Sequence, residues 1–326
     1  MRQWKILIAP ISLVVVILML FILNARQKVS LSTRSRLEAI PATAKKLSPA
    51  EDFYSPKLHS SEWQKPVPLP APVNTAGAED SPFITPDGKT LYIFFTPDPG
   101  IPAEKQLFDG VTGIWRSQKT ETGWSEPERV WLAKRNELAL DGCEFVLNDI
   151  MWFCSARRGN LRSIDLYTAE YRDGSWQKIK NAGRELNLDY LVGEMHISSD
   201  GQEMYYHSTR TGGAGGMDIW MIRKLNGGWQ APENVSVVNS IGDEGWPFVS
   251  EDGSELWFTR TYRGSPSIWR SKKTGDVWQK PELILSQFAG EPTLDREGNL
   301  YFTHHFYKDG KMIEADIYMA KKKLRK

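Results

Sequence analysis

The stretch DEGWPFVSEDGSELWF (residues 243–258) has the pattern of two short strands on either side of Asp252-Gly253. Apolar and polar residues alternate in both arms, and an Asp-Gly pair between such arms is a strong signal for a β-hairpin. Related stretches occur four more times, at 79–95, 143–155, 193–210 and 290–305. Five copies of one hairpin predict a repeat fold.

Each hairpin opens a longer unit. A third apolar strand that ends near a Trp follows the hairpin, and most units then continue with a Trp-x-x-Pro segment, such as WQKP at 278–281. Four strands per unit, with a period of about fifty residues, are typical of a β-propeller. We therefore predict an all-β, five-bladed β-propeller of four-stranded blades. The corresponding hairpin turns lie at Gly88, Asp149, Gly201, Gly253 and Gly298.

The two ends of the repeat region are complementary. The last unit stops after its third strand at 315–322, whereas residues 60–70 match a fourth strand, with WQKP at 63–66. We expect this N-terminal strand to close the ring, because closure removes exposed sheet edges. The long spacing between the first two turns predicts a loop insertion at 96–112. The predicted blades are 79–132, 141–185, 191–238, 243–286, and 289–322 completed by 60–70.

An apolar segment precedes the repeats. Residues 6–23 carry no charge and would span about 27 Å as a helix, close to the thickness of a bilayer. We predict a transmembrane signal anchor at 1–25, uncleaved because Leu23 stands where signal peptidase needs a small residue. Residues 26–59 are predicted as a linker with a short helix near 33–40, residues 60–322 as the propeller, and residues 323–326 as a basic tail.

The distribution of charged residues indicates on which side of the membrane the propeller lies and which partners it can bind. Basic residues on both sides of 6–23 leave the orientation open, but a very short N-terminal tail stays readily in the cytoplasm, which places the propeller outside it, in the periplasm or at the cell surface. A net charge of +1 over 326 residues gives no electrostatic case for nucleic acid. We expect a monomer whose partners are the membrane, through 6–23, and an envelope protein or glycan.

The two cysteines fall in one hairpin. If Asn148-Asp149 is a two-residue loop, Cys143 and Cys154 lie directly opposite each other, at a distance that a disulfide accepts. We predict this disulfide only if the domain is exported. Two small buried thiols in a sheet are an equally valid reading of the same pair.

The repeats resemble a known family. GGMDIW (215–220), NGGWQAPENV (226–235) and VNSIGDEGWPFVSEDGSELWF (238–258) look like the TolB-like, WD-like β-propeller repeats of envelope proteins. The resemblance covers residues 60–322. The second unit lacks the Pro after its Trp and the Asp-Gly turn, and the fifth has Glu-Gly instead. The resemblance implies a rigid binding platform, and the family has no shared catalytic residues to transfer.

Acidic residues mark the starts of the innermost strands. Because all these starts face one end of the ring, the acids are expected to gather at one mouth of the central channel. Carboxylates there would bind a cation or a basic ligand, or would serve glycoside hydrolysis as a pair. In a third reading they are structural and bond backbone or Arg. Glu79 and Glu244 fall two repeat positions earlier than Glu194 and Glu291, so the ring is not symmetric. The acids are Glu79, Asp80, Glu144, Glu194, Glu244 and Glu291.

The second strands return to the same mouth with basic residues. In the expected register Glu194 faces His207 and Glu291 faces His304, which would suit acid–base or metal chemistry, although salt-bridged structural pairs have the same pattern. A slip of one residue would send these side chains to opposite faces. The other candidate ligand contacts are His196, Arg210, Trp246 and Arg260.

The sequence lacks the common catalytic and cofactor signatures. It has no Ser-His-Asp set, nucleotide fingerprint or zinc-ligand spacing, and GGAGG (212–216) lacks the ending of a phosphate loop. We therefore expect no cofactor, no metal and no assigned catalytic residue. The favoured function is a membrane-anchored, non-catalytic binding platform for a protein, peptide or glycan. The alternative is a glycan hydrolase or lyase that uses the inner acids.

Overall fold

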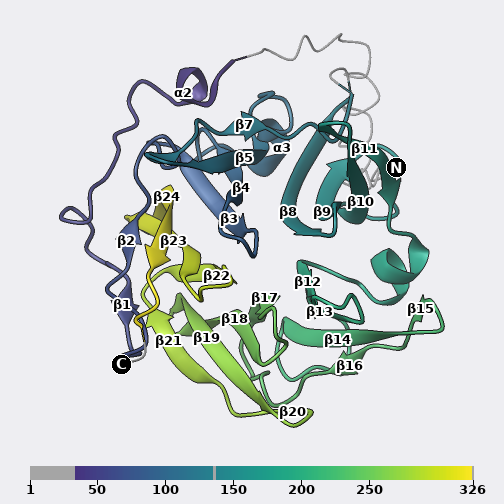
Figure 1. The fold of residues 1–326 in the computed structure, drawn as a ribbon. Coiled ribbons are helices and arrows are strands. Elements are labelled where there is room, and N and C mark those ends of the chain that lie inside the picture. Colours follow the sequence, from purple (N-terminus) through teal and green to yellow (C-terminus); the bar gives the residue numbers. More distant parts are fainter. Residues whose placement is uncertain (1–33, 135–136, 325–326) are drawn as a thin grey trace, which may run out of the picture.

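A computed structural model describes residues 34–134 and 137–324. Over these residues the regular secondary structure is almost entirely β, and the sheets stand around a common centre (Figure 1). This arrangement is a β-propeller, so the predicted all-β class is confirmed. The innermost strands are β3 (Ala78–Ile84), β8 (Ala139–Leu147), β12 (Met195–Ile197), β17 (Glu244–Val249) and β22 (Ala289–Leu294).

Three of the sheets run outward from one innermost strand through antiparallel neighbours. The first continues from β8 through β9 (Ile150–Arg157), β10 (Asp165–Arg172) and β11 (Ser175–Asn181). The second continues from β12 through β13 (Glu203–Ser208) and β14 (Asp218–Leu225) to β15 (Gly228–Trp229) and β16 (Glu233–Asn234). The third continues from β17 through β18 (Glu255–Tyr262) and β19 (Ser265–Thr274) to β20 (Val277–Trp278), β21 (Glu282–Ser286) and β1 (Lys57–Leu58).

The fourth sheet combines two antiparallel runs, which a single parallel pair, Ala315 with Ala78, joins. In one run, β2 pairs with β24 through Val67–Met319 and Pro68–Tyr318. Residues from 60–70 thus add the outer strand that the C-terminal run lacks, as the repeat pattern predicts. The runs are β22, β23 (Leu300–Lys308), β24 (Lys311–Ala320) and β2 (Val67–Pro68); and β3, β4 (Thr90–Thr96), β5 (Gly113–Thr120), β6 (Gly123–Trp124) and β7 (Glu128–Arg129).

The hairpin turns form where the sequence places them. Asn148 and Asp149 make the expected two-residue loop, since Leu147 pairs with Ile150. The loop at Asp252-Gly253 is longer than expected: the last strand pair is Val249 with Leu256. Gly253 has φ +70°, a conformation that a side chain would strain. Within this loop the Asp252 carboxylate accepts the Ser254 N–H at 3.0 Å, which stabilises the longer turn.

A bulge interrupts four of the five innermost strands. The pairing shifts between Asp80 and Phe83, Gly142 and Phe145, Gly245 and Phe248, and Gly290 and Thr293. Each shift contains a residue with positive φ, and each adds one unpaired residue to its strand. The bulges were not predicted from the sequence, and they change which side chains face the centre. The residues with positive φ are Ser81, Cys143, Trp246 and Glu291.

Apolar side chains from neighbouring sheets form the core. One cluster joins Phe153 and Tyr206, and another joins Trp257 to Phe302. Trp63, from the predicted closing strand, is 1% exposed and meets Trp257 edge to face at 5.4 Å. The packing therefore ties the N-terminal closing segment to two neighbouring sheets.

Residues 34–59, within the predicted linker, lie against the propeller. The helix α2 (Arg36–Ala39) forms in the predicted 33–40 region, and a capping box of Ser35 and Glu38 begins it. Lys57 of β1 pairs with Ser286 of β21. The remaining helical segments are α3 (Ala103–Gln106), inside the predicted 96–112 insertion, and the π-helical turn η1 (Glu185–Asp189).

Among residues 34–134 and 137–324, no helix is long and apolar enough to cross a membrane. The predicted signal anchor at 6–23 lies outside the described residues and stays a prediction.

Candidate functional site at the centre of the propeller

Two of the predicted acids are structural. Glu79 and Glu244 have no exposed surface. The Glu79 carboxylate accepts the Thr75 N–H at 2.8 Å and pairs with Arg36 at 3.2 Å. Burial raises the pKa of Glu79 to about 7, although Arg36 and Thr75 favour its charged form. The same pattern recurs one sheet away, where Glu244 accepts the Ser240 N–H at 2.9 Å and pairs with Arg260 at 2.7 Å.

The central cavity lies beside the bulges. Its volume is about 60 Å³, which holds a few water molecules or an ion and is far below the roughly 300 Å³ at which small-molecule sites begin. Each innermost strand or its direct extension contributes one triplet of residues to the wall. The triplets are 81–83, 143–145, 194–196, 246–248 and 291–293.

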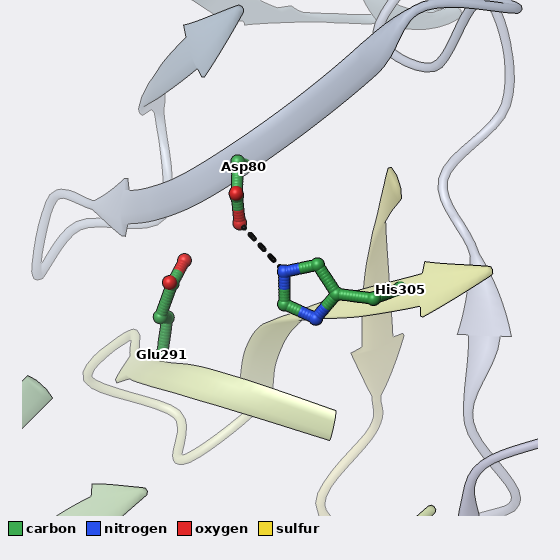
Figure 2. Close-up of side chains that lie close together, drawn as sticks. All are labelled: Asp80, Glu291 and His305. Carbon is green, nitrogen blue, oxygen red and sulfur yellow. Dashed lines mark ion pairs between the residues drawn. The ribbon is translucent and has the colours of Figure 1, made fainter. Parts of the chain in front are cut away.

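Carboxylates from different sheets meet in and beside this cavity. Glu144, Glu194 and Glu291 line it. Asp80 adjoins it and lies 3.4 Å from Nε2 of His305 (Figure 2). Ligand atoms of Asp80, Glu291 and His305 all lie within 4.8 Å of one another. In contrast to Glu79 and Glu244, none of these four carboxylates forms an ion pair with Lys or Arg among the described residues.

Burial and neighbouring groups shift the pKa values of these four carboxyl groups in different directions. Burial, and then the nearby Asp80 carboxylate, raise the pKa of Glu291 well above its ordinary value. Burial raises the pKa of Glu194 to about 7 and that of Glu144 to about 8. Burial also opposes ionisation of Asp80, but His305 holds the pKa of Asp80 below its usual range. The result is an ionised Asp80 beside carboxyl groups that retain protons near neutral pH.

The Glu144 carboxylate forms no ion pair with a residue that the structure describes. Its side chain is 6% exposed, and neither carboxylate oxygen has a hydrogen-bond partner among the described residues. Buried polar atoms are rarely left this way in native proteins. Because Glu144 lines the central cavity, its oxygens are available to a group that enters the cavity.

The predicted pair of Glu291 and His304 is wrong. His304 lies opposite Ala289, because the turn already places Leu294 opposite Leu300, one residue from the expected register, and the bulge at Glu291 shifts the register by one more. Its side chain has no exposed surface and bonds Asp52 at 3.0 Å. The next residue, His305, points to Asp80 instead. The sequence places His305 at the same mouth but not among the candidate ligand contacts, and the shifted turn and the bulge together put it in the position expected for His304.

The predicted pairing of Glu194 with His207 is confirmed for the backbone, where the His207 N–H donates to the Glu194 carbonyl at 3.0 Å. The His207 ring lies between the N–H groups of Glu194 and Trp246, at 3.3 and 3.4 Å. Burial lowers the pKa of His207 to about 4, and Arg162 adds to this effect. The ring is therefore a neutral packing group and makes no acid–base pair with the Glu194 carboxylate.

Four rings close the cavity toward the hairpin turns. His196 lies 4.3 Å from Phe145 and 4.4 Å from Phe248 between ring centroids, and Phe83 lies 5.2 Å from Phe145. Burial lowers the pKa of His196 to about 3, so this histidine is neutral. A larger cavity of about 710 Å³ on the turn side shares these four rings but none of the carboxylates of the central cavity.

The other predicted contacts divide between the cavity and the sheets. Trp246 lines the cavity, as expected. Arg210 stacks on Trp220 at 4.6 Å and Arg260 on Trp269 at 4.8 Å, and neither arginine lines the central cavity.

Both cysteines are free thiols. Cys143 is not opposite Cys154 as predicted: the bulge places Gly142 there, and Cys143 takes a φ of +57°. A hydrogen bond with Cys154, together with burial, raises the pKa of the Cys143 thiol well above its usual value.

No family model and no curated protein matches this chain. Solved structures resemble it at low identity. TolB from Acinetobacter baumannii is 13% identical, with 77% of this chain and 57% of that chain covered and a TM-score of 0.43. An endo-arabinase from Bacteroides thetaiotaomicron is 14% identical, with 79% and 98% covered and a TM-score of 0.48. An α-L-arabinofuranosidase from Podospora anserina, in complex with cellotriose, is 9% identical, with 81% and 97% covered and a TM-score of 0.46.

Proposed function

We propose that the ring is a five-bladed propeller of distant TolB-like kinship. The five triplets around the central cavity support this count, because each comes from a different innermost strand or its extension. The single parallel pair between Ala315 and Ala78 then marks the contact between the first and last blades. In this proposal residues 6–23 anchor the chain in the membrane as a monomer, with the propeller outside the cytoplasm.

We propose that the propeller is a non-catalytic platform that binds a protein or peptide through a positively charged group at the central cavity. The unneutralised carboxylates carry this proposal. Glu144, Glu194 and Glu291 line the cavity without Lys or Arg partners among the described residues, whereas buried Glu79 and Glu244 each have one. A cation from a partner would favour the ionised forms of these carboxyl groups, which burial otherwise disfavours, and would form charge-assisted hydrogen bonds with them.

Peptide binding to the full chain in detergent tests this proposal. Fluorescence anisotropy would compare a lysine-rich peptide with a glutamate-rich peptide of the same length. We expect only the lysine-rich peptide to bind, and the Glu144→Gln, Glu194→Gln double variant to weaken it at least about tenfold. Glu121→Gln, at an exposed position, is the control. Equal binding of both peptides, or unchanged binding by the double variant, would overturn the proposal.

One observation favours glycan hydrolysis as a second candidate. Glu291, with its raised pKa, lies beside Asp80, with its lowered pKa, and two carboxyl groups held in different protonation states are the pattern of an acid–base pair. The cavity of about 60 Å³ weighs against it, because a sugar ring does not fit. Incubation with arabinan and xylan tests it: sugar release that Glu291→Gln abolishes would support hydrolysis, and no release would exclude it for these glycans.

A further inference from the structure

Asp80, Glu291 and His305 converge from three strands, β3, β22 and β23 (Figure 2). Their ligand atoms lie within 4.8 Å of one another. Metal ions bind oxygen and nitrogen ligands at about 2.0–2.6 Å, so atoms with this spacing can share one ion. The three side chains thus have the separation of a ligand set before any ion is added.

The surrounding residues orient two of the three side chains. One Glu291 oxygen, Oε2, accepts the Ser81 N–H at 2.7 Å and the Thr303 hydroxyl at 3.0 Å. The Ser81 N–H also contacts Oδ1 of Asp80 at 3.1 Å. Fixed orientation of this kind is what supporting hydrogen bonds give to metal ligands. The Glu291 and Asp80 carboxyl groups also hydrogen-bond each other, and a shared ion would replace this contact.

Glu144 gives a second and independent indication of a ligand. It is a buried acid in the same cavity wall as Glu291, and both of its oxygens lack hydrogen-bond partners among the described residues. An ion with bound water would give the Glu144 oxygens partners, because metal-bound water donates hydrogen bonds to nearby carboxylates.

We propose that Asp80, Glu291 and His305 bind one divalent cation such as Mn²⁺, with Glu144 accepting hydrogen bonds from its bound water. Two carboxylates balance the charge of the ion. The two carboxylates suit Mn²⁺, and the imidazole nitrogen distinguishes this set from the all-oxygen sets that Ca²⁺ and Mg²⁺ prefer. Three protein ligands leave coordination positions for water or for a group of a partner. This inference rests on the proposed function in treating the central cavity as a binding site.

Calorimetric titration of the full chain in detergent with MnCl₂, after treatment with a chelator, tests the site. We expect one saturable site per chain. Asp80→Asn and His305→Gln should each weaken Mn²⁺ binding at least about tenfold. Glu121→Gln should bind as the unaltered chain does. Absence of saturable binding up to about 1 mM, or unchanged affinity in both variants, would overturn the proposal.

A spectroscopic measurement on the unaltered chain guards against variants that fail to fold. Electron paramagnetic resonance should show the free Mn²⁺ signal fall until one equivalent has bound, and an undiminished signal overturns the site. The peptide assay reports separately on the proposed function. Mn²⁺ binding without lysine-peptide binding supports the metal site and overturns the function, whereas peptide binding without Mn²⁺ binding does the reverse.

Discussion

Two sets of acids on the same innermost strands have different surroundings. The acids two positions before the bulge residue are buried and each is paired with an arginine, whereas the acids at the central cavity have no arginine or lysine partner among the described residues. Residue type alone therefore does not reveal the role of an acid in this fold; its position relative to the bulge does. The arginine pairs are Glu79 with Arg36, Asp141 with Arg157, and Glu244 with Arg260.

The largest expected effect comes from breaking an arginine pair. Arg260→Ala leaves Glu244 buried and uncompensated, which should lower the free energy of unfolding by about 3–5 kcal/mol. Urea denaturation followed by tryptophan fluorescence measures the loss. The control, Arg263→Ala, removes an exposed arginine nearby. A loss below about 1 kcal/mol for Arg260→Ala would mean that the pairing has little structural weight.

Glu144→Gln should raise the free energy of unfolding, and the size of this increase should depend on pH. Burial raises the pKa of Glu144 from 4.5 to about 8, so the folded state binds more protons than the unfolded state between these values. The wild-type free energy of unfolding therefore falls as pH rises through this window. The Gln side chain has nearly the shape of a protonated Glu and stays uncharged at every pH. We expect Glu144→Gln to be neutral at pH 4 and stabilising by about 1–3 kcal/mol at pH 8.5. Thermal unfolding of both chains across this range measures the difference, and parallel pH curves would contradict the expectation.

The repeat pattern predicts the scaffold because strand pairing depends on local signals. The alternation around Asp252-Gly253 and the match between WQKP at 63–66 and at 278–281 led to the observed hairpins and to the pairing of β2 with β24. The positions of Trp246 and Glu291 at the cavity also follow from aligning the units.

The site is less predictable for two physical reasons. First, the fifth hairpin has a turn one residue away from the expected register and a bulge that adds one more residue, so His305 lies at the site where His304 was expected. The partners of the structural acids are also distant in sequence: Arg36 reaches Glu79 from the predicted linker. No periodicity in a sequence encodes such a pair.

A smaller effect should follow from removing a hydroxyl that supports a structural acid. The Ser240 side chain donates to Glu244 at 2.5 Å, and Ser240→Ala removes this hydrogen bond to a buried carboxylate. We expect a loss of about 1–2 kcal/mol in the free energy of unfolding, measured by urea denaturation. Ser236→Ala, an exposed change in the same segment, should have no effect. Equal losses in the two variants would show that the hydroxyl of Ser240 is not specifically required.

The smallest expected effect tests the difference between the cavity acids and the arginine-paired acids most directly, because one acid of each set is changed in the same way. Burial raises the pKa of Glu194 to about 7, so at pH 5.5 this carboxyl group is mostly protonated, and Gln reproduces its shape and charge. Glu194→Gln should then change the free energy of unfolding by no more than about 0.5 kcal/mol. Glu244→Gln at the same pH leaves Arg260 without its charge partner and should cost several times more. Urea denaturation of both variants at pH 5.5 measures the two losses.

If Glu194→Gln lowered the free energy of unfolding as much as Glu244→Gln does, Glu194 would be a structural acid, and the distinction between the arginine-paired acids and the cavity acids would fail.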